Sequence, residues 1–185
     1  VIDGGVLGKP PFAPDVTHDE VAEAAGTTLE AVIALGEEGK AIEVMARGAA
    51  KIAQELYSAG RLNGIIALGG SMGTSLALVV MRALPLGVPK LLVSTIVYSS
   101  MITSETMCKD AAAMPTVADL WGLNRVTKQV LEHAAGAITG MVEISREEIS
   151  EKPLIGITMW GGTTRCATRI RPLLEQRGYE AVAFH

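Results

Sequence analysis

The sequence predicts an α/β fold in which a parallel sheet carries helices on both faces. Apolar runs at 64–68 and 90–95 flank a glycine-rich turn and an apolar helix, and the same order of strand, glycine turn, helix and strand recurs at 153–185. Composition agrees, because apolar residues make up 49% of the 185 residues and aromatic residues only 4%. An aliphatic core of this kind is typical of parallel sheets covered by helices.

The first 60 residues are predicted to hold two helices. Residues 1–3 resemble the end of a strand and lead into a proline-containing loop. Thr17 and Glu20 have the spacing of a capping box, which begins a short helix that ends near Gly26. The strongest helical pattern covers 37–59, where apolar residues recur at i, i+3, i+4 and i+7.

A βαβ unit follows at the centre of the chain. It consists of a strand at 64–68, a turn at 69–74, a helix at 75–84 and a strand at 90–95. Because the first strand is wholly apolar, we expect it to be covered on both faces. The crossover between the two strands should be right-handed.

Beyond this unit the pattern is weaker until a second long helix at 123–142. We predict a long functional loop at 98–113 and a short strand or turn at 116–120. The polar run at 145–152 is typical of a linker.

The C-terminal residues repeat the βαβ order and end soon after the second strand. The sequence predicts a strand at 153–160, a glycine turn, a helix at 165–177 and a strand at 180–185. One such unit buries too little surface to stand alone. We therefore divide the chain into a first domain, 1–150, and the opening unit of a second, incomplete domain, 151–185.

Charge and composition exclude several partners. The formal net charge is −4 and no basic run is present, so the sequence has no electrostatic signature of nucleic-acid binding. No apolar stretch reaches the length of about 20 residues that spans a bilayer, so we expect no membrane partner. Cys108 and Cys166 lack metal-ligand spacing, which indicates a reducing compartment and hence a cytoplasmic protein.

The glycine-rich segment after the first buried strand is the leading candidate site. Glycines let a ligand approach the backbone, and the start of the next helix offers N–H groups and a partial positive charge that suit phosphate. The segment matches neither the Walker A nor the GxGxxG pattern, so a tight strand-to-helix turn is the alternative. The candidate ligand contacts are Gly69, Gly70, Ser71, Gly73 and Thr74.

A second candidate consists of Gly161, Gly162, Thr163 and Thr164, which occupy the same strand-to-helix setting. One threonine can instead be an N-cap. Cys166 follows in the first helical turn, where the helix dipole would lower the pKa of a nucleophilic thiol. The alternative is a small buried side chain, because no histidine is placed by the sequence to activate it.

Polar residues at other strand and helix ends complete the candidates. Ser94 and Thr95 end a central strand, and ligands of open α/β sheets bind outside such ends. Asn124 begins a helix and is either a ligand contact or a cap. Asp3 could meet a ribose or a metal, or form an Asx turn. The three histidines are scattered and give neither a triad nor a metal cluster.

Three segments, at 64–95, 122–141 and 154–185, together resemble the Tm-one-like ATP-binding domain family, named for a plant tobamovirus-resistance protein. The bacterial members of that family are largely uncharacterised. The resemblance implies two Rossmann-like domains, ATP held mainly by the first, and self-association into dimers. It also implies that 69–74 is part of the nucleotide loop.

Departures from the family pattern bear on the ligand. Family members are about twice as long, so we expect this chain to be truncated at both ends and to lack a first strand and loop. Met72 stands where many members have a glycine, and the family's motif is not recognisable at 98–120.

The sequence thus predicts a protein that binds a nucleotide or another phosphorylated small molecule. ATP, with or without Mg²⁺, is the expected cofactor, and a homodimer is the expected assembly. Two alternatives stay open. One is an enzyme acting on a small phosphorylated or acyl metabolite at the domain interface, with Cys166 contributing. The other is a protein-interaction module that nucleotide stiffens.

Overall fold

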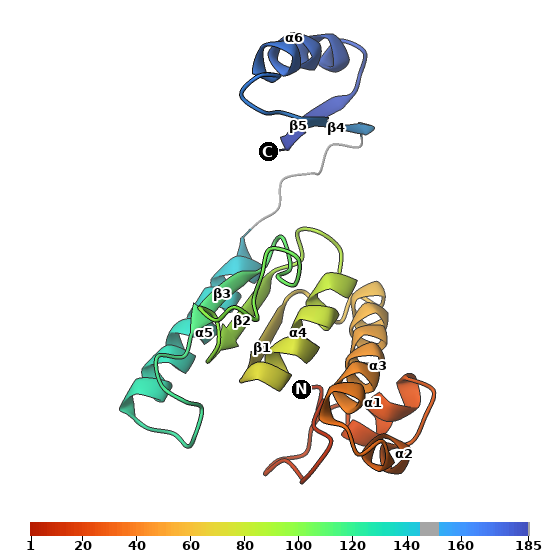
Figure 1. Ribbon diagram of the computed structural model, residues 1–185, viewed down its shortest axis with the longest axis vertical. Helices are drawn as coiled ribbons and strands as arrows, with labels where there is room; N and C mark the ends of the chain where they lie inside the picture. The colour runs from red at the N-terminus through yellow and green to blue at the C-terminus, as the bar shows by residue number, and fades with distance from the viewer. Residues whose placement is uncertain (145–151, 185) are drawn as a thin grey trace. The chain divides into compact units, whose positions relative to one another are not determined.

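The computed structural model describes residues 1–144 and 152–184 (Figure 1). The chain divides into two compact units, Val1–Ile144 and Ser145–His185. The linker expected at 145–152 falls outside the described residues except for Lys152. Each unit is described by itself below.

A three-stranded parallel sheet forms the centre of the first unit (Figure 1). Its strands are β1 (Ile65–Gly69), β2 (Lys90–Ser94) and β3 (Ala112–Pro115), in the order β1-β2-β3. Gly69 pairs with Ser94, and Ser94 pairs with Pro115. The carboxyl ends of all three strands therefore meet at one edge of the sheet.

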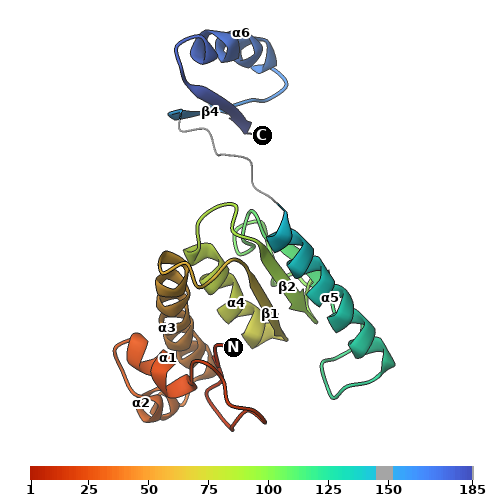
Figure 2. The same ribbon diagram turned by 180° about the vertical axis from the view of Figure 1, so that it is seen from behind.

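Helices cover both faces of the central strand β2. Leu92 packs with α4 (Ser71–Ala83), while its neighbours Leu91 and Val93 pack with α5 (Arg125–Glu143). Because successive side chains of a strand point to opposite faces, α4 and α5 lie on opposite sides of the sheet (Figures 1 and 2). The predicted α/β fold, with a parallel sheet and flanking helices, is confirmed.

The expectation that β1 is covered on both faces was wrong. Its side chains alternate in burial, and Ile66 and Leu68 are 39% and 51% exposed. Ile65 and Ala67 contact the cluster around α4, whereas Ile66 and Leu68 point to the face on which α5 packs over β2. The apolar run therefore predicted the strand correctly but did not predict which of its faces is buried.

Three helices precede the sheet: α1 (His18–Ala24), α2 (Leu29–Ala34) and α3 (Glu38–Ser58). The capping box that begins α1 and the long helix α3 are confirmed. Helix α2 was not predicted, although Thr28 caps it. Helix α3 packs along α4 and against α1, and a Cβ on Gly48 would lie only 1.9 Å from the Val21 carbonyl oxygen.

Two boundaries of the central region differ from the prediction. Gly70 is the N-cap of α4, so 71–74 form the first helical turn rather than an extended loop. Strand β3 (Ala112–Pro115) begins inside the predicted loop and ends before the predicted strand or turn at 116–120. Its four residues are too few to give a periodic signal in the sequence.

The connection from β2 to β3 contains no helix and packs against α4. Cys108 contributes to the same apolar cluster as Leu92 and Met81. At the start of β2, the Nζ of Lys90 donates hydrogen bonds to an Asp110 carboxylate oxygen at 2.6 Å and to the Pro85 carbonyl at 2.8 Å. The Lys90 side chain is 0% exposed, so this pair fixes the end of the connection to the core.

The second unit is a single βαβ arrangement. Strands β4 (Leu154–Thr158) and β5 (Glu180–Phe184) pair in parallel with each other, and α6 (Thr164–Glu175) packs on β5. Ala167 of the helix and Ala181 of the strand are buried between them.

Candidate functional site

The carboxyl edge of the β1-β2-β3 sheet carries a cavity of about 500 Å³. It is lined by Thr95, which follows β2, by Tyr98 of the same connection, by Pro115 at the end of β3 and by 116–119 beyond it. The N-terminus of α4 opens at the same edge, because Gly70 follows β1 directly. This is the place where open parallel sheets bind ligands.

Thr74 and Ser94, which the sequence predicts as ligand contacts, form a hydrogen bond with each other. Their hydroxyl oxygens lie 2.6 Å apart and both side chains are buried. The Ser94 hydroxyl also accepts a hydrogen bond from the Ile96 backbone N–H at 3.1 Å. These residues therefore connect the first turn of α4 to the end of β2, and neither of them lines the cavity.

The glycines of the predicted loop have different roles. A Cβ on Gly69 would lie 2.8 Å from the Gly73 Cα, so both glycines allow the strand end and the helix to pack closely. A Cβ on Gly70 would lie 3.6 Å from the Thr95 hydroxyl, which places Gly70 beside the cavity lining. Gly70 provides no side-chain cap, so the N–H groups that begin α4 have no side-chain partner from the N-cap.

A strained turn follows β3. The Thr116 N–H donates to the Ser94 carbonyl at 3.2 Å, and the Ala118 N–H donates back to the Thr116 carbonyl at 2.7 Å. Val117, between them, has a φ of 64° and is 80% exposed. A positive φ in the middle of such a turn is rare and strained for a β-branched residue.

Three polar groups around the cavity have no partner within the described part of the chain. They are the Thr95 hydroxyl, the Tyr98 hydroxyl and the Asp119 carboxylate, for which no hydrogen bond or ion pair exists among residues 1–144 and 152–184. All three residues are exposed. Sequence reasoning selected Thr95 and missed Tyr98, Val117 and Asp119. A polar residue soon after a strand could have suggested Asp119 had the bounds of β3 been recognised.

Asn124 lies at the N-cap of α5. Its Oδ1 accepts hydrogen bonds from the N–H groups of Val126 at 2.9 Å and Thr127 at 3.1 Å. The Thr127 hydroxyl completes a reciprocal capping box by accepting the Asn124 N–H at 2.9 Å. The capping alternative therefore accounts for the Asn124 oxygen.

The second glycine turn belongs to the second unit. Both Gly161 and Gly162 are exposed, and the hydroxyls of Thr163 and Thr164 donate to the Trp160 carbonyl. No side chain caps α6. Cys166 lies in the first turn of α6 and is exposed, so the alternative of a small buried side chain was wrong.

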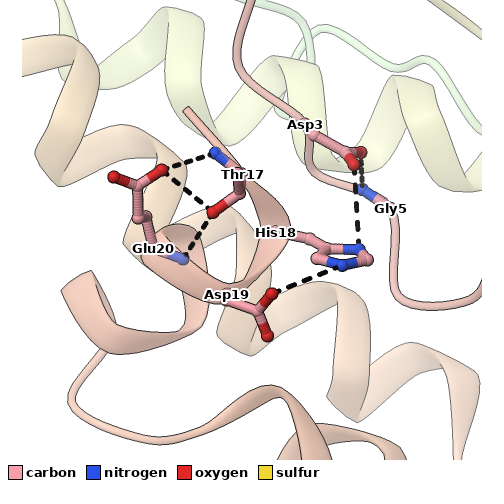
Figure 3. Close-up of polar contacts among 6 residues, drawn as sticks. All are labelled: Asp3, Gly5, Thr17, His18, Asp19 and Glu20. Atoms are coloured by element: carbon pink, nitrogen blue, oxygen red, sulfur yellow. Dashed lines mark hydrogen bonds and ion pairs between the residues drawn. The ribbon is translucent and has the colours of Figure 1, made fainter. Parts of the chain in front are cut away.

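Polar contacts join the N-terminal segment to the start of α1 (Figure 3). The Asp3 carboxylate accepts the Gly5 N–H at 2.9 Å, which is the predicted Asx turn, and lies 3.7 Å from His18 Nδ1. The other ring nitrogen of His18 lies 3.6 Å from Asp19. In the described ranges, no three His, Cys, Asp or Glu side chains are placed to hold a metal ion.

Comparison with known proteins gives the family. The N-terminal domain model of the Uncharacterised protein family (UPF0261) matches residues 1–147, and the C-terminal domain model of the same family matches 152–185. This chain belongs to that family. None of the helices in the described residues combines the length and apolar character needed to cross a bilayer.

Relatives extend from bacteria to plants. The chain is 43% identical to a UPF0261 protein of Brucella suis biovar 1, over 100% of this chain and 44% of that protein. It is 41% identical to a UPF0261 protein of Clostridium tetani, over 100% of this chain and 46% of the relative. It is homologous to the ToMV resistance protein Tm-1(GCR237) of Solanum lycopersicum, at 38% identity over 80% of this chain and 20% of the tomato protein. The chain thus spans less than half the length of these relatives.

Proposed function

We propose that this UPF0261 member binds a nucleotide, with the phosphates against the N-terminus of α4. The observation that carries the proposal is that the uncapped N-terminus of α4 and a cavity of about 500 Å³ lie at the same carboxyl edge of a parallel sheet. Thr95 lines the cavity, and Gly70, the N-cap of α4, lies beside Thr95. The cavity is open to solvent, and four of the seven residues that line it, Thr95, Tyr98, Val117 and Asp119, are exposed.

The chemistry of the α4 N-terminus suits an anion. The N–H groups of Ser71, Met72 and Gly73 precede the first intrahelical hydrogen bond, which runs from the Thr74 N–H to the Gly70 carbonyl at 2.9 Å. Together with the helix dipole they attract negative charge. Gly70 adds no Cβ between this turn and Thr95, which lines the cavity.

Among nucleotides, ATP with or without Mg²⁺ is the ligand we propose, because the sequence segments around this loop resemble Tm-one-like ATP-binding domains. A cytoplasmic location and a homodimer remain part of the proposal.

Replacing Ser71 by proline tests the proposal with little expected effect on the fold. Ser71 is the first helical residue of α4, where proline is tolerated because its N–H has no intrahelical partner. Gly70 has φ −85° and ψ −152°, an extended conformation that a following proline accepts. The variant therefore removes one proposed phosphate donor. Losing a hydrogen bond to a charged group, about 1.5–3 kcal/mol, should weaken ATP binding about 10- to 150-fold.

The measurement is calorimetric titration of the full chain with ATP, with and without Mg²⁺, alongside a matched control. Glu38→Pro places proline at the first position of α3, after an extended Glu37 that makes no side-chain cap. We expect this control to bind as the wild type does. Unaltered affinity in Ser71→Pro would remove the phosphates from α4, and no binding of millimolar ATP by the wild type would refute the proposed function.

A further inference from the structure

We propose that the cavity beside β2 and β3 is the nucleoside subsite of this nucleotide site and that Asp119 determines its specificity by accepting hydrogen bonds from the ribose hydroxyls. The inference rests on the proposed function, which assigns a position only to the phosphates of the nucleotide. It assigns the ribose to Asp119, a residue that the sequence did not single out.

Asp119 differs from every other aspartate in the chain. All five aspartates are described, and four have partners: Asp3 and Asp19 contact His18, Asp15 contacts the N-terminal ammonium, and Asp110 contacts Lys90. Asp119 is exposed, has no hydrogen bond or ion pair to any described residue, and lines the cavity. A carboxylate with free acceptor positions is suited to a vicinal diol, which presents two O–H donors.

The turn that carries Asp119 is strained at Val117. A β-branched residue at φ 64° is disfavoured, and backbone strain of this kind clusters at ligand sites, where the surroundings hold it. The surroundings here are the hydrogen bonds from the Thr116 N–H to Ser94 and from the Ala118 N–H to Thr116. Together they fix the backbone next to Asp119.

The rest of the lining fits a nucleoside better than a phosphate. It contains no lysine or arginine, and the Asp119 carboxylate would repel an anion. Pro115, Val117 and Ala118 give it apolar walls, and the Tyr98 ring is 88% exposed. An exposed aromatic ring can stack on a base. The lining therefore favours the neutral nucleoside in the cavity, while the N-terminus of α4 favours the charged phosphates.

Thr95 joins the two parts of the site. It lines the cavity, and its hydroxyl lies 3.6 Å from the position of a Cβ on Gly70, the residue that begins α4. Its N–H is held by the Gly69 carbonyl at 3.2 Å, so its backbone is fixed to β1. One ligand can therefore contact the α4 amides and the cavity on either side of a single residue.

The test compares three probes on the full chain: ATP, 2′,3′-dideoxy-ATP and inorganic tripolyphosphate. We expect wild-type protein to bind ATP at least about tenfold more tightly than dideoxy-ATP, because a charged acceptor loses its hydroxyl donors. In Asp119→Ala the two nucleotides should bind equally, while tripolyphosphate affinity should stay unchanged or rise slightly. Glu132→Gln, which removes an exposed carboxylate on α5, should keep the wild-type ratio.

The ratio of the two nucleotide affinities separates a specific role from a general charge effect, since losing one negative charge strengthens both nucleotides alike. Equal binding of ATP and dideoxy-ATP by the wild type would overturn the subsite while leaving the phosphate site intact. An unchanged ratio in Asp119→Ala would overturn the role of Asp119. Failure of all three probes to bind would refute the proposed function and this inference with it.

Discussion

The buried ion pair between Lys90 and Asp110 fastens the connection between β2 and β3 to the protein core. The Lys90 ammonium is fully buried and contacts only the Asp110 carboxylate and the Pro85 carbonyl among the described residues. The other Asp110 oxygen accepts from the Cys108 thiol at 3.2 Å, and the Gly87 N–H donates to the carboxylate at 2.9 Å. Because Tyr98 belongs to the same connection, the pair also bears on the candidate site.

The two partners should respond unequally to removal. Asp110→Ala leaves a buried ammonium without its counter-ion, which typically costs about 3–5 kcal/mol of unfolding free energy. Lys90→Met leaves a carboxylate that is 20% exposed and keeps its hydrogen bonds from Gly87 and Cys108, so we expect about 1–3 kcal/mol. The double variant removes both charges and should cost less than the sum of the single changes, with a coupling of about 0.5–3 kcal/mol.

Urea unfolding of the full chain at pH 7, followed by circular dichroism, measures these costs. The first unit carries most of the helix, so its transition dominates the signal. The reasoning is refuted if Asp110→Ala costs less than about 1 kcal/mol, or if the two single changes are additive in the double variant.

The pH dependence gives an independent check on the same pair. Burial raises the pKa of Asp110, but hydrogen bonds from Lys90, Gly87 and Cys108 and the Lys90 charge outweigh burial and lower the pKa from 3.8 to about 2. A lowered pKa contributes stability that is present above pH 4 and is lost as the pH falls from about 4 to 2. At 1.36 kcal/mol for each tenfold change in the protonation constant, the contribution is about 2 kcal/mol. It should be absent in Asp110→Ala.

Two further predictions concern backbone conformation and close packing. Val117→Gly should raise the free energy of unfolding by about 1 kcal/mol. It relieves strain of about 1–3 kcal/mol at a positive φ, and the greater flexibility of glycine in the unfolded chain offsets about 0.5–1 kcal/mol of that gain. Urea unfolding checks this, and destabilisation would contradict the strained turn. Gly48→Ala should cost more than about 2 kcal/mol because its Cβ would meet Val21, whereas Gly136→Ala on α5 has open space and should stabilise by about 0.5–1 kcal/mol. Similar melting temperatures for these two variants would contradict the packing of α1 on α3.

Local signals gave most of the fold. The capping box at Thr17, the periodicity of α3 and the two apolar strands around α4 are properties of short stretches, and each appeared where the sequence placed it. Cover on both faces of β1 was wrong because burial depends on where α5 packs, which is not a property of 64–68. Strand β3 was missed because its four residues carry no period.

The site was predictable only in its location. The rule that ligands bind at the carboxyl ends of parallel strands selected Ser94 and Thr95, and Thr95 lines the cavity. The glycine-rich loop selected Gly70, which lies beside Thr95. It could not tell that Ser94 and Thr74 would bond to each other across the strand and helix. Nor could it find Val117, because nothing in the side chain of valine indicates a left-handed backbone.

Helix N-termini by themselves do not distinguish the site. Helices α3 and α6 also begin without a side-chain cap, so an uncapped start is not special to α4. Asn124 shows the opposite case, in which a residue predicted as a ligand contact uses its oxygen on the helix that it begins. What sets α4 apart is that its N-cap, Gly70, lies beside Thr95, which lines the cavity. Asp119 lines the same cavity, and its carboxylate has no partner among the described residues. The nucleotide that we propose would meet amide donors, a hydroxyl and a carboxylate in that order, and its own charge falls from phosphate to ribose along the same path.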